Sequence, residues 1–189
     1  VQREAEALIN AGYEVDVICC RTAGSLTVDQ YKGVTIYREK YKFLLNFWKP
    51  GSLGEKLYQY LIFFISAAHR LNILHFQKQY DSIQVHNLSD FLVFSAFIPK
   101  LLHVPIILDL HDLMPEFFAS RFRSRQSLLF RLVLFQERLS CRFADHVITV
   151  SEHWRQSLIQ RGVPEEKCSV VMNVADDSIF QYSGSFLLP

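Results

Sequence analysis

The stretch PIILDLHDLMPE at residues 105–116 decides the fold of this protein. Its first six residues are apolar except for Asp109, which is typical of a β-strand covered by helices on both faces. His111 and Asp112 follow the strand directly. Ligands bind beyond the carboxyl ends of the strands in parallel sheets, so the stretch predicts both a buried strand and a site at its end.

Similar segments lie on both sides of this strand and alternate with helical patterns. Just before the stretch we predict a strand at 82–86 and a helix at 89–103. After it we predict helices at 127–143 and 152–161 and strands at 146–151 and 168–172. Toward the N-terminus we predict a helix at 1–11, strands at 14–20 and 34–38, loop-like residues at 21–32 and a long helix at 53–78. This alternation predicts an α/β fold with a parallel sheet and right-handed crossovers.

Composition excludes several classes of protein. The 189 residues correspond to about one domain, and 20 Lys and Arg against 19 Asp and Glu give no basic field for a nucleic acid. The four cysteines form no CxxC pair, which argues against a zinc site and a disulfide framework and favours a reducing compartment. The seven glycines form no GxGxxG or P-loop. We therefore predict no nucleic-acid partner, no metal and no cofactor.

Polar residues follow the predicted strands. His86 and Asn87 end one strand, and Ser151 ends another and precedes the helix that starts at Glu152. Carboxyl ends of parallel strands meet at one edge of a sheet, so we expect these residues to lie near His111. The alternative is that they only cap the helices that follow, and we expect Ser151 to be such a cap in any case. Asp109 is expected to be a buried, hydrogen-bonded carboxylate.

Five sequence blocks, taken in order, resemble the GT-B glycosyltransferases that have a subfamily-4-like amino-terminal domain. The blocks are AEALINAGYEVDVIC, YDSIQVHN, PIILDLHDLMPE, ERLSCRFADHVITVSE and RGVPEEKCSVVMNVADDSIF. The resemblance implies a Rossmann-like, three-layer domain at residues 1–180, which forms the acceptor-binding half of a two-domain enzyme, and a tail at 181–189.

The same resemblance implies that two parts of such an enzyme are outside this chain. One is the first strand with its Gly-rich loop, and the other is the C-terminal domain that binds the nucleotide-sugar donor. The first strand of a doubly wound sheet is central, so its loss would leave a gap between its neighbours and unpaired backbone groups. We expect the fragment alone to be inactive.

The resemblance implies transfer of a sugar, with retained configuration, from a nucleotide-sugar to a saccharide or lipid-linked acceptor, as in polysaccharide biosynthesis. His111 matches the family histidine and is the expected catalytic residue, because a neutral imidazole accepts or donates a hydrogen bond near neutral pH. The residues expected to line the cleft are His86, Asn87, Asp112, Glu116, Ser151 and Glu152. Two alternatives remain: a GT-B-fold sugar-nucleotide epimerase, in which carboxylates act as acid and base, and a non-catalytic remnant or interaction module.

The helix at 53–78 carries two apolar stripes, whereas packing on a sheet requires only one. The first stripe is Leu57, Leu61, Phe64, Ala68 and Leu71, and the second is Tyr58, Ile62, Ile65, Ile73 and Phe76. Its apolar run is shorter than a bilayer span. The preceding Phe43, Leu44, Phe47 and Trp48 lie among lysines, which suits a membrane interface. We predict a cytoplasmic protein with peripheral membrane contact; the alternative is that both stripes pack against the sheet and a neighbouring helix or the domain outside this chain.

Overall fold

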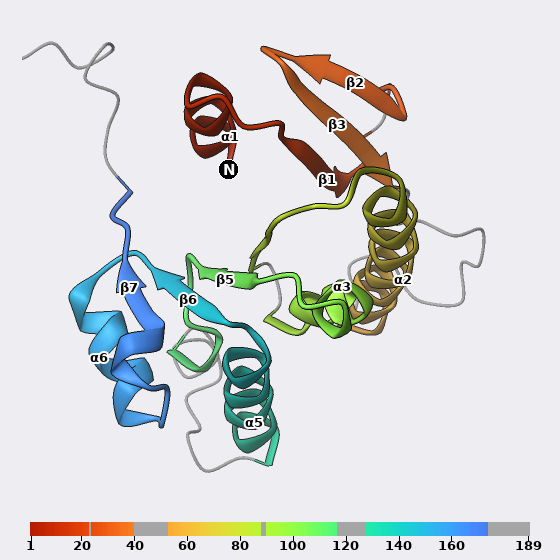
Figure 1. Cartoon of the computed structure of the whole chain (residues 1–189). Helices are drawn as coiled ribbons and strands as arrows, with labels where there is room; N and C mark the ends of the chain where they lie inside the picture. Colours follow the sequence, from red (N-terminus) through yellow and green to blue (C-terminus); the bar gives the residue numbers. More distant parts are fainter. Residues whose placement is uncertain (23, 40–52, 88–89, 117–127, 174–189) are drawn as a thin grey trace, which may run out of the picture.

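The computed structural model of the 189-residue chain describes residues 1–22, 24–39, 53–87, 90–116 and 128–173 (Figure 1). The first half contains α1 (Gln2–Asn10), β1 (Asp16–Cys20), β2 (Val28–Tyr31), β3 (Val34–Glu39), α2 (Leu53–Lys78) and β4 (Ile83–His86). The second half contains the 3-10 helix η1 (Asp90–Ala96), α3 (Phe97–Leu101), β5 (Ile106–Leu110), α5 (Leu128–Phe143), β6 (His146–Thr149), α6 (Glu152–Gln160), η2 (Glu165–Lys167) and β7 (Cys168–Val170).

The strands form two sheets. One has the order β1-β3-β2 and the other the order β4-β5-β6-β7, in which every neighbouring pair is parallel. Figure 1 shows the first sheet in red and orange in the upper part of the molecule, and β5, β6 and β7 in green and blue below it. Within the lower sheet, Leu108 of β5 is level with Val85 and Val147, and both Leu108 and Val147 are inaccessible to solvent. The α/β, Rossmann-like class predicted from the sequence is confirmed.

A break separates the two sheets. Among the described residues, β1 pairs only with β3, and β4 pairs only with β5. Every residue of β1 is half-buried, whereas β5 is almost fully buried. The connection is made by side chains instead: Ile18 of β1 and Val85 of β4 both pack against the same cluster around Phe63 and Ala67 of α2.

The prediction of a loop at residues 21–32 was wrong, because β2 forms there. It pairs antiparallel with β3, from Val28 opposite Tyr37 to Tyr31 opposite Val34. The turn between them consists of Lys32 and Gly33, both with positive φ (48° and 86°). Two successive residues with positive φ make a turn whose twist matches the right-handed twist of the two strands that it joins. The Lys-Gly pair lacks the Asn or Asp that usually marks this turn in a sequence.

The helix predicted at 89–103 starts with a tighter winding than expected. Residues Asp90–Ala96 form η1, and α-helical winding begins only in α3. Five of the seven residues of η1 are buried, and the segment packs against α2, α5 and β5. A segment enclosed on several sides has no free polar face, so tertiary packing determines its winding more than helix propensity does.

A buried charged cluster holds the lower sheet's helices together. Glu137 of α5 and Asp90 of η1 are each 1% exposed. The Arg161 guanidinium, just after α6, lies 3.1 Å from Glu137 Oε1 and 2.7 Å from Glu116 Oε1. Burial raises the pKa of Glu137 to about 7, although Arg161 acts in the opposite direction. Burial likewise raises the pKa of Asp90.

One side of α2 is buried and another is apolar but exposed. The buried side consists of Phe63, Ala67, Leu71, Leu74 and His75, whereas Leu57, Leu61, Ile65, Ile73 and Phe76 are exposed. Two members of the first stripe named from the sequence, Leu57 and Leu61, are therefore exposed and do not pack on the sheet. The exposed apolar residues are spaced by three, four and eight residues, and the exposed His69 interrupts them between Ile65 and Ile73.

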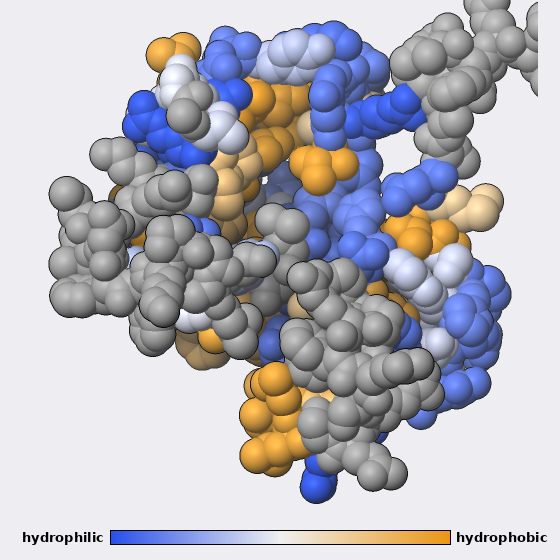
Figure 2. Space-filling view, turned by 180° about the vertical axis from the view of Figure 1, so that it is seen from behind, coloured by the Kyte–Doolittle hydropathy of each residue, from blue (hydrophilic) through white to orange (hydrophobic). Residues whose placement is uncertain are grey.

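The helix α5 carries a second exposed apolar stripe, formed by Leu128, Leu132, Phe135 and Leu139. Figure 2 shows orange, apolar atoms at the bottom of the molecule, where α5 lies in Figure 1. Neither α5 nor any other described helix is both long and apolar enough to cross a bilayer. The predicted contact residues Phe43, Leu44, Phe47 and Trp48 lie outside the described residues.

Candidate functional site

The parallel register of β4 and β5 brings three polar side chains to one point. His86, the last residue of β4, is level with Asp109 of β5. His111 follows Asp109 by two residues, and side chains two residues apart point to the same side of an extended chain. The sequence therefore places an imidazole on either side of one carboxylate at the carboxyl ends of both strands.

The three side chains are in direct contact. Oδ2 of Asp109 lies 2.9 Å from Nδ1 of His86 and 3.1 Å from Nε2 of His111. These two ring nitrogens are 3.3 Å apart, and the rings are stacked at an interplanar angle of 22°. The amide of Gln84 also donates to Oδ2 of Asp109, at 3.2 Å. We name His86, Asp109 and His111 the strand-end cluster.

Burial differs sharply within the strand-end cluster. Asp109 is 2% exposed, whereas the side chains of His86 and His111 are 26% and 29% exposed. Burial alone would raise the pKa of Asp109, but the hydrogen bond from His86 and the charges of both histidines outweigh it and hold this pKa below its ordinary value. The carboxylate is therefore ionised at neutral pH and fixes both rings, which keep one side open to solvent.

Asn87 holds the loop that follows β5. Its Oδ1 accepts a hydrogen bond from the backbone N–H of His111 at 2.9 Å, and its Nδ2 donates to the carbonyl of Asp112 at 2.6 Å and to Oδ1 of Asp90 at 3.1 Å. With its side-chain amide used in this way, Asn87 fixes the position of His111. Asp112 contributes to this hydrogen-bond network only the backbone carbonyl that accepts from Asn87.

The structure gathers four of the seven predicted site residues and places the other three elsewhere. His86, Asn87, His111 and Asp112 lie together at the ends of β4 and β5. The remaining three make other contacts: Ser151 accepts from Trp154 N and caps α6, Glu152 bonds to Arg155 and Gln156, and Glu116 bonds to Arg161. The expected capping role of Ser151 is confirmed.

Sequence reasoning missed three neighbours of the two histidines. Asp109 was expected to be buried and hydrogen-bonded, which is confirmed, but its contact with both rings was not anticipated; the register of two adjacent strands is the signal that could have found it. Glu4 of α1 approaches Nε2 of His86 with Oε2 at 3.7 Å, and Asn173 approaches Nδ1 of His111 with Nδ2 at 3.5 Å. No local pattern in the sequence connects these two residues to the cluster.

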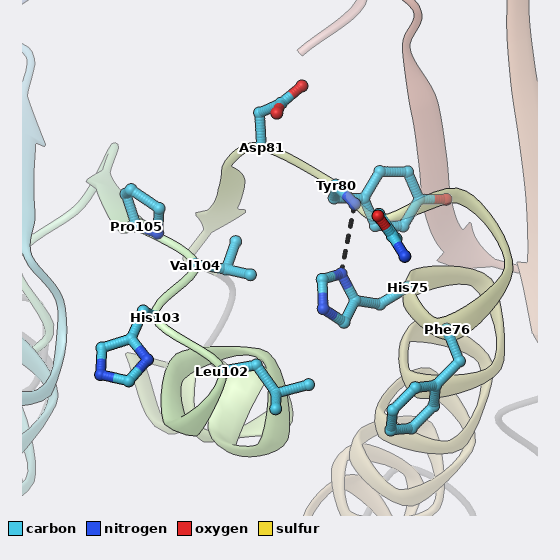
Figure 3. A pocket seen from close by; sticks show the side chains of 9 residues that line it. His75, Phe76, Tyr80, Asp81, Leu102, His103, Val104 and Pro105 are labelled. Carbon is cyan, nitrogen blue, oxygen red and sulfur yellow. Dashed lines mark hydrogen bonds between the residues drawn. The ribbon is translucent and has the colours of Figure 1, made fainter.

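A surface hollow of about 470 Å³ lies at the opposite ends of the same strands (Figure 3). Its lining comes from the end of α2, from residues 79–81 before β4 and from residues 102–105 before β5. In it, Nδ1 of His75 accepts a hydrogen bond from the backbone N–H of Tyr80 at 3.2 Å, which terminates α2. Ligands of parallel sheets bind at the carboxyl ends of strands, so this hollow is not the candidate site.

A parallel sheet flanked by helices, with polar residues gathered at its strand ends, defines the Rossmann-like half of a GT-B glycosyltransferase. The chain belongs to Glycosyltransferase Family 4, whose family model matches residues 1–178. No curated protein matches the sequence.

Among solved structures, the chain is similar to sucrose-phosphate synthase from Thermosynechococcus elongatus, with a TM-score of 0.64 and 18% sequence identity. The match covers 95% of this chain and 43% of the synthase, so the chain spans less than half of that enzyme. At this identity the likeness concerns the fold. The family resemblance stated from the sequence blocks is confirmed.

Proposed function

We propose that this chain is the acceptor-side domain of a retaining glycosyltransferase that uses a nucleotide-sugar donor. The acceptor is a saccharide or a lipid-linked sugar, and the donor is held by a second, C-terminal domain. The observation that carries the proposal is the strand-end cluster, which presents two partly exposed imidazoles on a buried carboxylate in a chain of Glycosyltransferase Family 4.

The contacts of His111 suit a catalytic residue that touches a sugar. Its backbone N–H is held by Asn87 and its Nε2 by Asp109, which leaves Nδ1, near Asn173, as the ring nitrogen that can meet a hydroxyl group. A fixed imidazole can take part in positioning a sugar hydroxyl and in accepting its proton. Asp109 acts through His111 as a positioning residue. In this mechanism the nucleotide-sugar is a substrate and the reaction needs no cofactor.

Product analysis of the complete protein tests the proposal. We expect one member of a panel of UDP- and GDP-sugars to be consumed only when an acceptor is present, and NMR of the product to show the donor's anomeric configuration. Conversion of a nucleotide-sugar into its isomer without an acceptor would instead identify an epimerase. If no nucleotide-sugar is consumed with any acceptor, the protein is a non-catalytic module.

The exposed stripes of α2 and α5 support a membrane location for the acceptor. On α5 the apolar stripe is accompanied by Arg131, Arg138 and Arg142, and the helix's only acidic residue, Glu137, is buried against Arg161. An apolar stripe flanked by cations is the pattern of a helix that lies on an anionic bilayer surface. We propose peripheral contact with the cytoplasmic leaflet, where a lipid-linked acceptor would be within reach.

Liposome flotation tests this location. We expect the protein to float with anionic vesicles at low salt, and the double variant Leu132→Asn/Phe135→Asn to reduce the floated fraction several-fold. Tyr13→Asn is the control, because Tyr13 is 64% exposed and apolar but lies outside both stripes. Absence of the wild-type protein from the vesicle fraction would contradict peripheral contact, as would an equal reduction in the control variant.

A further inference from the structure

We propose that Asp90 is a positioning residue, which holds His111 in place through the side chain of Asn87. Asp90 is the first residue of η1 and is 1% exposed, so its carboxylate is enclosed by the protein and does not itself meet a substrate. Its Oδ1 accepts a hydrogen bond from Nδ2 of Asn87 at 3.1 Å. This role of Asp90 rests on the proposed function, in which His111 is the catalytic residue.

The backbone of Asn87 is fixed by the lower sheet, whereas its side chain can rotate. Its backbone N–H donates to the carbonyl of Asp109 at 2.9 Å, directly after the last residue of β4. From this fixed point the side-chain amide reaches the loop after β5. There its Oδ1 accepts from the N–H of His111 at 2.9 Å, and its Nδ2 donates to the carbonyl of Asp112 at 2.6 Å. The position of His111 therefore depends on which way this amide faces.

Asp90 selects one of the two orientations of that amide. The oxygen and nitrogen of an Asn side chain have nearly the same shape but opposite hydrogen-bonding roles. In the observed orientation each of the two atoms has a suitable partner. In the reversed orientation, the Asn87 oxygen would face the oxygens of Asp112 and Asp90, and its nitrogen would face the N–H of His111. Loss of the Asp90 oxygen removes one of the contacts that disfavour this reversal and other rotations of the side chain.

Asp90 is itself held rigidly, as a positioning residue must be. Five of the seven residues of η1 are buried, and the segment packs against α2, α5 and β5. Water does not compete for a carboxylate that is 1% exposed, so its hydrogen bond with Asn87 is stronger than a surface contact would be. This chain of contacts thus begins in the core and ends at the partly exposed ring of His111.

Hydrogen exchange in the complete protein, resolved at single amides, tests this role without requiring enzyme activity. In Asp90→Ala the N–H of His111 should exchange about 10-fold faster, the effect of losing one hydrogen bond to a buried carboxylate. The matched control is the N–H of Ile106 at the other end of β5, which donates to Oδ2 of Asp145 at 2.9 Å and should keep its exchange rate. Asp90→Asn retains an acceptor oxygen and should keep most of the protection of His111.

A double-mutant cycle tests whether Asp90 acts through Asn87. Asn87→Ala removes the acceptor of the His111 N–H, so it should accelerate exchange at His111 by itself. Asp90→Ala added to that variant should then leave the exchange rate of His111 unchanged. A further acceleration of about 10-fold in the double variant would contradict a path through Asn87.

Turnover of the complete enzyme separates this role of Asp90 from the proposed function. We expect Asp90→Ala to lower kcat for sugar transfer by about 10-fold, because catalysis depends on the position of His111, and to leave KM for the donor nearly unchanged. Faster exchange at His111 with unchanged kcat would support positioning by Asp90 but contradict the catalytic role of His111. Three results would overturn the role of Asp90: unchanged exchange at His111 in Asp90→Ala, an equal acceleration at Ile106, or the same loss of protection in Asp90→Asn.

Discussion

Replacing His111 with alanine in the complete enzyme should lower the turnover number for sugar transfer by about 100-fold or more, the range of positioned acid–base groups. The physical reason is that the ring is held at both its backbone N–H and its Nε2, so its remaining nitrogen has a fixed position. We expect KM for the donor to change much less, because the donor is proposed to bind mainly to the other domain. Steady-state kinetics separates the two quantities.

Two further variants make this result specific. His153→Ala removes an exposed histidine and should leave turnover unchanged. Asp109→Asn should lower turnover and also displace the pH profile, because it removes the carboxylate that contacts both rings. Unchanged turnover in His111→Ala, with the fold intact, would remove His111 from the mechanism; a loss in Asp109→Asn without displacement of the profile would reduce Asp109 to a structural role.

Replacing Arg161 with methionine should reduce the free energy of unfolding by about 3–5 kcal/mol, as breaking a buried ion pair does. Arg161 is the cation that contacts Glu137, whose side chain is 2% exposed, and the substitution leaves that carboxylate and the nearby Asp90 without compensation. Urea denaturation at pH 8 measures the change. Lys32→Met, at the exposed Lys32–Glu6 pair, should reduce the free energy of unfolding far less, because solvent screens that pair.

The loss of unfolding free energy in the Arg161→Met variant should depend on pH in a defined direction. The pKa of Glu137 is about 7 in the folded protein, against 4.5 for an unperturbed glutamate. A carboxyl group with a raised pKa stabilises the fold fully below pH 4.5, and this contribution is lost as the pH rises through 7. We therefore expect Arg161→Met to be less destabilising at pH 5 than at pH 8. Glu137→Gln should remove most of that pH dependence and rescue the Arg161→Met variant, and failure to rescue would contradict an electrostatic cause.

The strands of the lower sheet could be predicted because buried parallel strands are apolar on both faces. The runs around Ile106, Val147 and Cys168 show this pattern, and the structure places strands at each of them. β2 could not be predicted in the same way, since its four residues VDQY neither alternate between apolar and polar nor form an apolar run, and they are mostly exposed. The winding of η1 was also out of reach, because it depends on contacts with α2, α5 and β5 that are remote in sequence.

The candidate site was predictable where it depends on strand ends and unpredictable where it depends on tertiary contacts. His86 and His111 follow directly from the rule for parallel sheets. The pairing of Asp109 with both rings needs the relative register of β4 and β5, which one sequence does not state. Glu116 was grouped with the site from its position near His111, but the side chain bonds to Arg161, which lies 45 residues away in the chain.

The break between the sheets has a mechanical and a chemical consequence. In the described residues β1 and β4 are linked by side chains, including those around α2 and the hydrogen bond from Tyr80 to Asp16, so a shift of one sheet against the other would break no backbone ladder. Each open strand margin also carries amide and carbonyl groups that attract another extended polypeptide. A segment paired with the open edge of β4 would immobilise this strand and with it His86. The position of His86 relative to His111 therefore depends on what pairs with that edge.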